Sequence, residues 1–155
     1  MTLTEGSEKL ARALLLPINP AVVVLLGIYT VVWGFWVANP FWSVFKSSQL
    51  YSVMDGLWFL ELFGIPAEPF WGCVAIICGT LTTYGAVKRK YKPLVRGATI
   101  IGFHWLIICI LYFMGDPTNT GGITALLMAV YGAFLWLNLR VNFKDSHDMD
   151  DVLRK

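Results

Sequence analysis

Charged residues and cysteines are both scarce in this sequence, and each shortage excludes whole classes of protein. Only 14% of the 155 residues are charged, whereas 57% are hydrophobic and the mean hydropathy is +0.63. A typical soluble domain carries about a quarter charged residues, so this chain has too few to cover a surface in water. The composition therefore excludes a disordered chain, a nucleic-acid-binding domain and an ordinary soluble enzyme. The length indicates a single domain over residues 1–155.

The three cysteines, Cys73, Cys78 and Cys109, all lie in apolar segments, which excludes a disulfide framework of the secreted type. Cys73 and Cys78 are five residues apart, which places them about 140° apart around a helix. We therefore expect buried free thiols that behave as small hydrophobic side chains.

Long apolar runs are what the sequence does contain. Crossing a bilayer takes about 20 mostly apolar residues, and four segments come close to that length. They are residues 21–38, 69–87, 97–115 and 122–139. We predict an all-α polytopic membrane protein whose four transmembrane helices form a compact bundle. We expect no cleavable signal peptide at the N-terminus, because no small-residue cleavage site follows the first apolar run.

A fifth segment, residues 48–63, is apolar at helical spacing but contains Asp55 and Glu61. Each carboxylate costs about 2.5–3.5 kcal/mol at the centre of a bilayer, so two of them disfavour a span. We predict an interfacial amphipathic helix here. Asp55 and Glu61 are about 240° apart around a helix, so they do not form an acid–base pair.

The basic residues support this topology. With four spans and the N-terminus inside, every Lys and Arg except Lys46 lies in the cytoplasm, in agreement with the positive-inside rule. Five spans with the N-terminus outside fit nearly as well, since only Lys9 and Arg12 then lie outside. Both arrangements place the tail, residues 141–155, and one basic loop in the cytoplasm. The loop residues are Lys88, Arg89, Lys90, Lys92 and Arg96, and we expect them chiefly to set topology, although such a cluster also attracts anionic lipid.

Small residues recur every fourth position in three of the four spans, and such stripes let helix backbones approach one another in lipid. The stripes are Thr30, Gly34 and Ala38; Ala75, Gly79 and Thr83; and Ala125, Ala129 and Ala133. They predict close helix packing, either inside the bundle or between copies of the chain.

Tryptophans cluster around the predicted outer ends of the first two spans and the segment that joins them. These residues are Trp33, Trp36, Trp42, Trp58 and Trp71. Aromatic belts at a membrane–water interface have this composition, so we predict an anchoring rim rather than a ligand cage.

His104 is the one ionisable side chain well inside a predicted span, and such residues are functional candidates by default. We expect a neutral histidine that is hydrogen-bonded across the bundle, with a proton relay or ligand contact as the alternative. The sequence contains no nucleophile motif, phosphate-binding loop or metal-ligand spacing. We therefore predict no enzyme, no cofactor and no metal site.

Residues 105–142, WLIICILYFMGDPTNTGGITALLMAVYGAFLWLNLRVN, resemble small multi-span membrane proteins of tailed bacteriophages and bacteria. The resemblance implies a protein of the bacterial or host inner membrane. The expected partners are the lipid bilayer and a second copy or another membrane protein, with no nucleic acid. We predict a non-enzymatic protein that acts through helix packing. The alternatives are a holin-like permeabilising protein, from whose strongly basic tails this near-neutral tail departs, and a small transporter or channel subunit.

Overall fold

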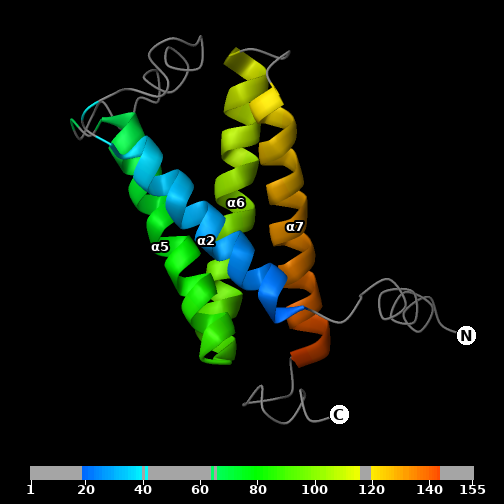
Figure 1. Ribbon diagram of the computed structural model, residues 1–155. Helices are drawn as coiled ribbons and strands as arrows, with labels where there is room; N and C mark the ends of the chain where they lie inside the picture. The colour runs from blue at the N-terminus through cyan, green and yellow to red at the C-terminus, as the bar shows by residue number, and fades with distance from the viewer. Residues whose placement is uncertain (1–18, 40, 42–63, 65, 116–119, 144–155) are drawn as a thin grey trace, which may run out of the picture.

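The computed structural model describes residues 19–39, 41, 64, 66–115 and 120–143, which contain four α-helices (Figure 1). The helices are α2 (Pro20–Val37), α5 (Ala67–Val87), α6 (Tyr91–Gly115) and α7 (Thr120–Phe143). All four are long and apolar enough to cross a membrane, so the predicted all-helical class with four membrane-spanning candidates is confirmed. The predicted interfacial helix at 48–63 lies outside the described residues.

Nearby side chains account for where several of the helices begin and end. The Asn19 side chain caps α2 by accepting a hydrogen bond from the Ala21 amide at 2.9 Å, and Pro20 occupies the first turn, where its missing N–H costs nothing. Helix α6 begins at Tyr91, six residues before the predicted start of its span, because the basic segment continues the helix beyond the apolar run. Helix α7 likewise continues to Phe143, so the predicted tail begins as helix.

A tight turn of three basic residues joins α5 to α6. The Lys90 amide donates to the Gly85 carbonyl at 2.8 Å and the Arg89 amide donates to the Ala86 carbonyl at 3.3 Å. This pair of hydrogen bonds is a Schellman motif, which requires a left-handed residue at its centre. Arg89 takes that conformation, with φ at 52°, where glycine is more common. The turn is short enough to make α5 and α6 antiparallel neighbours.

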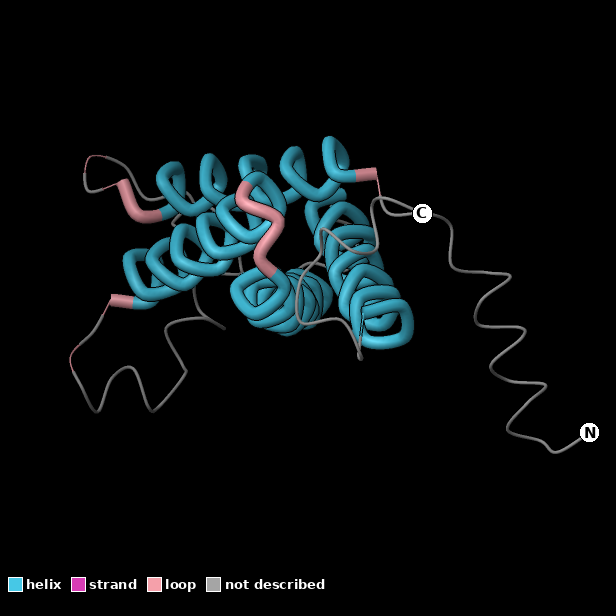
Figure 2. Tube along the Cα trace, turned by 90° about the horizontal axis from the view of Figure 1, so that it is seen from below, coloured by secondary structure: helices cyan, strands magenta, loops and turns pink. Residues whose placement is uncertain are grey.

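Each helix packs mainly on the next one along the chain: α2 on α5, α5 on α6 and α6 on α7. Figure 1 shows α2 and α5 inclined relative to α6 and α7, and Figure 2 shows α6 between α5 and α7. The ends of α5 and α7 and the starts of α2 and α6 lie at the same end of the molecule. The α5–α6 turn is at this end, which we call the basic end.

Glycines bring α2 and α5 together. Gly27 lies opposite Gly79, and Gly34 lies opposite Gly72, so the antiparallel helices meet at two levels that are seven residues apart. A Cβ atom built on Gly79 would lie 2.6 Å from the Gly27 carbonyl oxygen, and one on Gly34 would lie 2.7 Å from the Gly72 carbonyl oxygen. No side chain fits at those distances, so the two backbones touch directly.

Three predicted packing residues on α5, Ala75, Gly79 and Thr83, lie on its contact with α2, as does Gly34 from the other side. On α7, Ala125 and Ala129 are buried, but Ala133 is exposed and Gly132 makes the close approach to α6. Two steps of four residues overshoot two helical turns by about 80°, whereas seven residues fall short by only about 20°. The last residue of the α7 stripe, Ala133, is therefore at the edge of the contact, where its side chain is exposed.

The surface of the described helices is strongly apolar. Leu25 on α2, Ile77 on α5, Phe103 on α6 and Leu127 on α7 are all at least 58% exposed. Exposed apolar area on every helix is unfavourable in water and suits the hydrocarbon core of a bilayer. Cys78 and Cys109 are buried free thiols, as expected, but Cys73 is exposed on this surface, so that part of the prediction is wrong.

Candidate functional site

His104 on α6 is buried, with only 2% of its surface exposed, and is surrounded by tryptophan rings. The imidazole centroid lies 5.3 Å from the ring of Trp33, 5.4 Å from that of Trp105 and 5.8 Å from that of Trp71. The rings of Trp33 and Trp105 meet the imidazole edge to face, at 73° and 75°, which is a favourable arrangement for aromatic pairs. We call His104 and these three residues the tryptophan–histidine cluster.

Three helices contribute to this cluster, Trp33 from α2, Trp71 from α5 and the other two residues from α6. The Trp105 indole N–H donates to the Thr30 hydroxyl oxygen at 3.2 Å. The Thr30 hydroxyl donates in turn to the Leu26 carbonyl at 2.9 Å, so its proton is already used within α2. The cluster thereby joins α2 to α6, two helices that are not neighbours along the chain.

The hydrogen bond that was expected of His104 is made by the residue beside it. Neither ring nitrogen of His104 has a hydrogen-bond partner among the described residues, and the same holds for the Trp71 indole N–H. The prediction of a histidine hydrogen-bonded across the bundle is therefore wrong: the imidazole packs against tryptophan rings, and the Trp105 indole makes the hydrogen bond to α2. Buried polar groups without partners are costly, and they are uncommon outside functional or strained sites.

Only part of the predicted tryptophan belt faces outward. Trp36 is 56% exposed and can anchor α2 at an interface, but Trp71 is buried and Trp33 is partly buried against the core. The last two face His104 instead, so the prediction of a rim is wrong for them. Trp42 and Trp58 lie outside the described residues. Tryptophan content alone cannot separate the two roles, because the direction of each ring depends on which helices pack together.

The chemistry of the tryptophan–histidine cluster is that of one imidazole in an aromatic pocket. Within the described residues, the single carboxylate is Glu68, in the first turn of α5, and no three His, Cys, Asp or Glu side chains are grouped closely enough to hold a metal ion. An isolated imidazole can accept a proton or bind a hydrogen-bonding ligand. It has no partner here with which to form an acid–base pair.

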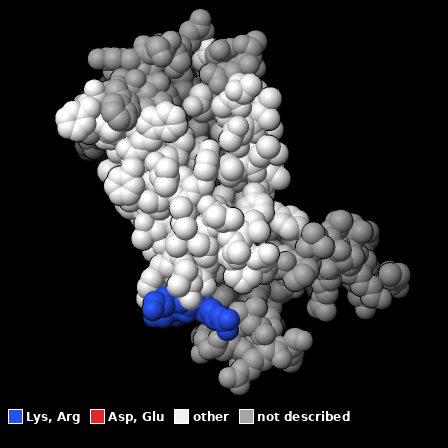
Figure 3. All heavy atoms as spheres, viewed as in Figure 1, with Lys and Arg blue, Asp and Glu red and all other residues white. Residues whose placement is uncertain are grey.

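The residues of the predicted basic loop gather at one end of the molecule. Lys88, Arg89 and Lys90 form the α5–α6 turn, and Lys92 and Arg96 occupy the first two turns of α6. Arg140, in the last turns of α7, reaches the same end, and Figure 3 shows the basic side chains together there. Among the described residues, every basic side chain is at this end.

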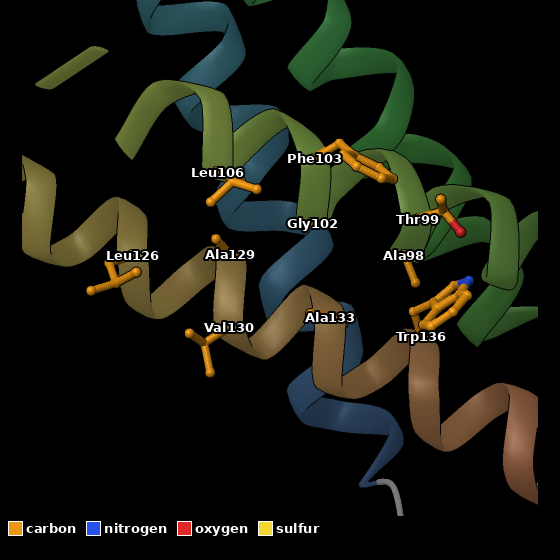
Figure 4. A pocket seen from close by; sticks show the side chains of 10 residues that line it. All are labelled: Ala98, Thr99, Gly102, Phe103, Leu106, Leu126, Ala129, Val130, Ala133 and Trp136. Carbon is orange, nitrogen blue, oxygen red and sulfur yellow. The ribbon is translucent and has the colours of Figure 1, made fainter. Parts of the chain in front are cut away.

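A second candidate site lies on the surface between α6 and α7. A hollow of about 360 Å³ is lined by apolar side chains and one threonine: Ala98, Thr99, Gly102, Phe103, Leu106, Leu126, Ala129, Val130, Ala133 and Trp136. We call it the α6–α7 groove. Figure 4 shows Trp136 beside Ala98 at one end and Leu126 at the other. Its size is within the range of about 300–1,000 Å³ that is usual for small-molecule sites.

Alternation of small and large side chains creates the α6–α7 groove. Gly102 and Gly132 bring the helices close, and a Cβ atom on Gly132 would lie 2.9 Å from the Gly102 Cα atom. Small residues therefore form the floor, while Phe103, Leu106 and Val130, all well exposed, stand along the sides. The groove was not among the features predicted from the sequence, although the large residues at helical spacing beside the alanine stripe were a signal for it.

No family model, characterised protein or solved structure matches this chain. Its candidate sites are therefore defined by their own geometry, namely a buried imidazole among three tryptophans and an apolar groove that leads towards a basic end.

Proposed function

We propose that this chain is a small non-enzymatic integral membrane protein that acts by binding another membrane component at the α6–α7 groove. One observation carries the proposal. The closest small-residue contacts, such as Gly27 with Gly79, are made inside the bundle, whereas the α6–α7 groove is left open on the surface. An open apolar concavity on a lipid-facing surface suits an acyl chain or a helix of another protein.

The basic end suggests an orientation for this role. Lys and Arg are enriched on the cytoplasmic side of membrane proteins, so the α5–α6 turn and the end of α7 belong in the cytoplasm. This orientation, and the resemblance of residues 105–142 to phage and bacterial membrane proteins, support a bacterial inner membrane as the location.

Site-specific photocrosslinking tests the proposal. A photoreactive phenylalanine analogue in place of Phe103, which is exposed along the side of the α6–α7 groove, should form a discrete adduct with a membrane component in cells. The matched control is the same analogue at Thr80, which is exposed on α5 away from the groove. Adducts at Phe103 that are as diffuse as those at Thr80 would contradict a binding role for the groove.

Proton-linked transport is a second candidate function, favoured by the two unpartnered ring nitrogens of His104. An imidazole inside a membrane bundle can exchange a proton with a passing substrate or water chain. In liposomes that contain an internal pH-sensitive dye, proton flux through the wild-type protein should then disappear in His104→Ala. A flux that is absent from the wild type, or equal in both proteins, rules out this candidate. Leakage of a large dye would instead indicate holin-like lesions.

A further inference from the structure

The α6–α7 groove continues into basic residues on both of its helices. On α6, Lys92, Arg96, Thr99 and Phe103 recur at spacings of four, three and four residues, so they follow one side of the helix. On α7, Arg140 is seven residues after Ala133 and four after Trp136. This spacing places Arg140 on the same side of α7 as those two residues of the groove. All three basic side chains are exposed.

Arg140 is held at the mouth of the α6–α7 groove. Its guanidinium carbon lies 5.1 Å from the centre of the Trp136 ring, within the range of a cation–π interaction. Trp136 itself lines the groove beside Ala98 (Figure 4). The apolar surface and the positive charge are therefore adjacent parts of one site.

From this juxtaposition we infer that the α6–α7 groove binds an anionic glycerophospholipid, with an acyl chain in the groove and the phosphate at Arg96 and Arg140. The inference rests on the proposed role of the groove as a contact surface and names its occupant. A guanidinium forms two parallel hydrogen bonds to phosphate oxygens, so two arginines provide a strong and oriented headgroup site. Lys92 adds a third positive charge on the α6 side.

Charge also argues against a second copy of the chain as the occupant. Copies that share one membrane orientation would bring Arg96 and Arg140 of one molecule near the same residues of the other, and like charges repel. Among the described residues, the one acidic side chain, Glu68, lies at the opposite end, where it cannot compensate. A lipid phosphate would bring a negative charge to the depth of Arg96 and Arg140, just outside the apolar groove.

Lipid retention by the full-length protein tests the inference. The protein is placed in phosphatidylcholine nanodiscs that contain a minor fraction of phosphatidylglycerol, and the bound lipid is identified by native mass spectrometry after release. The wild type should retain phosphatidylglycerol in preference to phosphatidylcholine. The double variant Arg96→Gln/Arg140→Gln should lower this preference about thirtyfold, since each arginine in contact with the phosphate contributes about five- to sixfold.

Two variant pairs separate the site from general effects. Ala133→Phe fills the groove and should abolish retention, whereas Thr80→Phe adds the same ring elsewhere on the surface and should not. Lys88→Gln/Lys90→Gln removes the same charge at the α5–α6 turn and should leave the preference intact. Because Arg96 and Arg140 are exposed, their replacement tests the headgroup site without disturbing the core.

Three results overturn the inference: equal retention of the two lipids by the wild type, no change in Arg96→Gln/Arg140→Gln, or an equal loss in Lys88→Gln/Lys90→Gln. If one of these occurs while photocrosslinking at Phe103 captures a protein or a second copy, the occupant is wrong and the proposed function stands. If Phe103 also captures nothing discrete, both proposals fail.

Discussion

The α2–α5 and α6–α7 contacts are both antiparallel helix pairs with glycines where the helices approach most closely, yet only the second pair carries a groove. Helices α2 and α5 meet through two glycine pairs, Gly27 with Gly79 and Gly34 with Gly72. Helices α6 and α7 meet through one such pair, Gly102 with Gly132, beside alanines and large exposed side chains.

This difference shows how the spacing of glycines along a helix determines whether a contact between two apolar helices is closed or leaves a groove. Two glycine pairs seven residues apart remain on the same side of each helix, so the backbones stay in contact over two turns. A single pair permits direct backbone contact at one level, and the larger side chains beside it line an opening. The same small residues can therefore close one contact and form the floor of a surface site in another.

Gly79→Leu should have the largest effect on stability. Its side chain would overlap the Gly27 carbonyl oxygen and the Val31 backbone, neither of which can move without separating α2 from α5. We expect the free energy of unfolding in lipid bicelles to fall by about 3 kcal/mol, at the upper end of typical overpacking costs. Thr80→Leu, the exposed neighbour, is the control and should change it by less than about 0.5 kcal/mol. A small loss for Gly79→Leu would show that the α2–α5 contact is not tight.

Gly132→Leu should have an intermediate effect, because the closest contact of an added Cβ atom, 2.9 Å to the Gly102 backbone, is less severe than the 2.6 Å contact at Gly79. We expect a loss of about 1–2 kcal/mol in the same unfolding measurement. Ala133→Leu, one residue further on and facing the groove, is the matched control and should be neutral within about 0.5 kcal/mol. If Gly132→Leu costs as much as Gly79→Leu, the two contacts are equally closed and the comparison fails.

The smallest effect concerns the hydrogen bond between Trp105 and Thr30, which links the two helix pairs. A double-mutant cycle with Trp105→Phe and Thr30→Val should give a coupling energy of about 0.6 kcal/mol, the average for interhelical hydrogen bonds in a membrane protein. Trp36→Phe in place of Trp105→Phe is the control, since Trp36 is exposed, and should show no coupling. Strictly additive effects of Trp105→Phe and Thr30→Val would mean that the bond does not stabilise the bundle.

Much of the framework was predictable, whereas the sites were not. Four apolar runs predict four helices because a bilayer requires every backbone polar group to be satisfied within its own segment. His104 was recognisable as a candidate because ionisable residues are rare in such runs. The surroundings of His104 were not predictable, since Trp33 and Trp71 come from other helices and tryptophan is equally typical of a membrane interface.

What the sequence alone determined is the number of apolar helices and the clustering of basic residues beside the ends of particular spans, because hydropathy and charge are properties of single segments. The tertiary structure decided which small residues meet, which tryptophans turn inward and where the α6–α7 groove opens. These features depend on the rotation and register of one helix against another. A shift of one residue around a helix is about 100°, which is enough to bury Gly132 against Gly102 and leave the Ala133 side chain exposed.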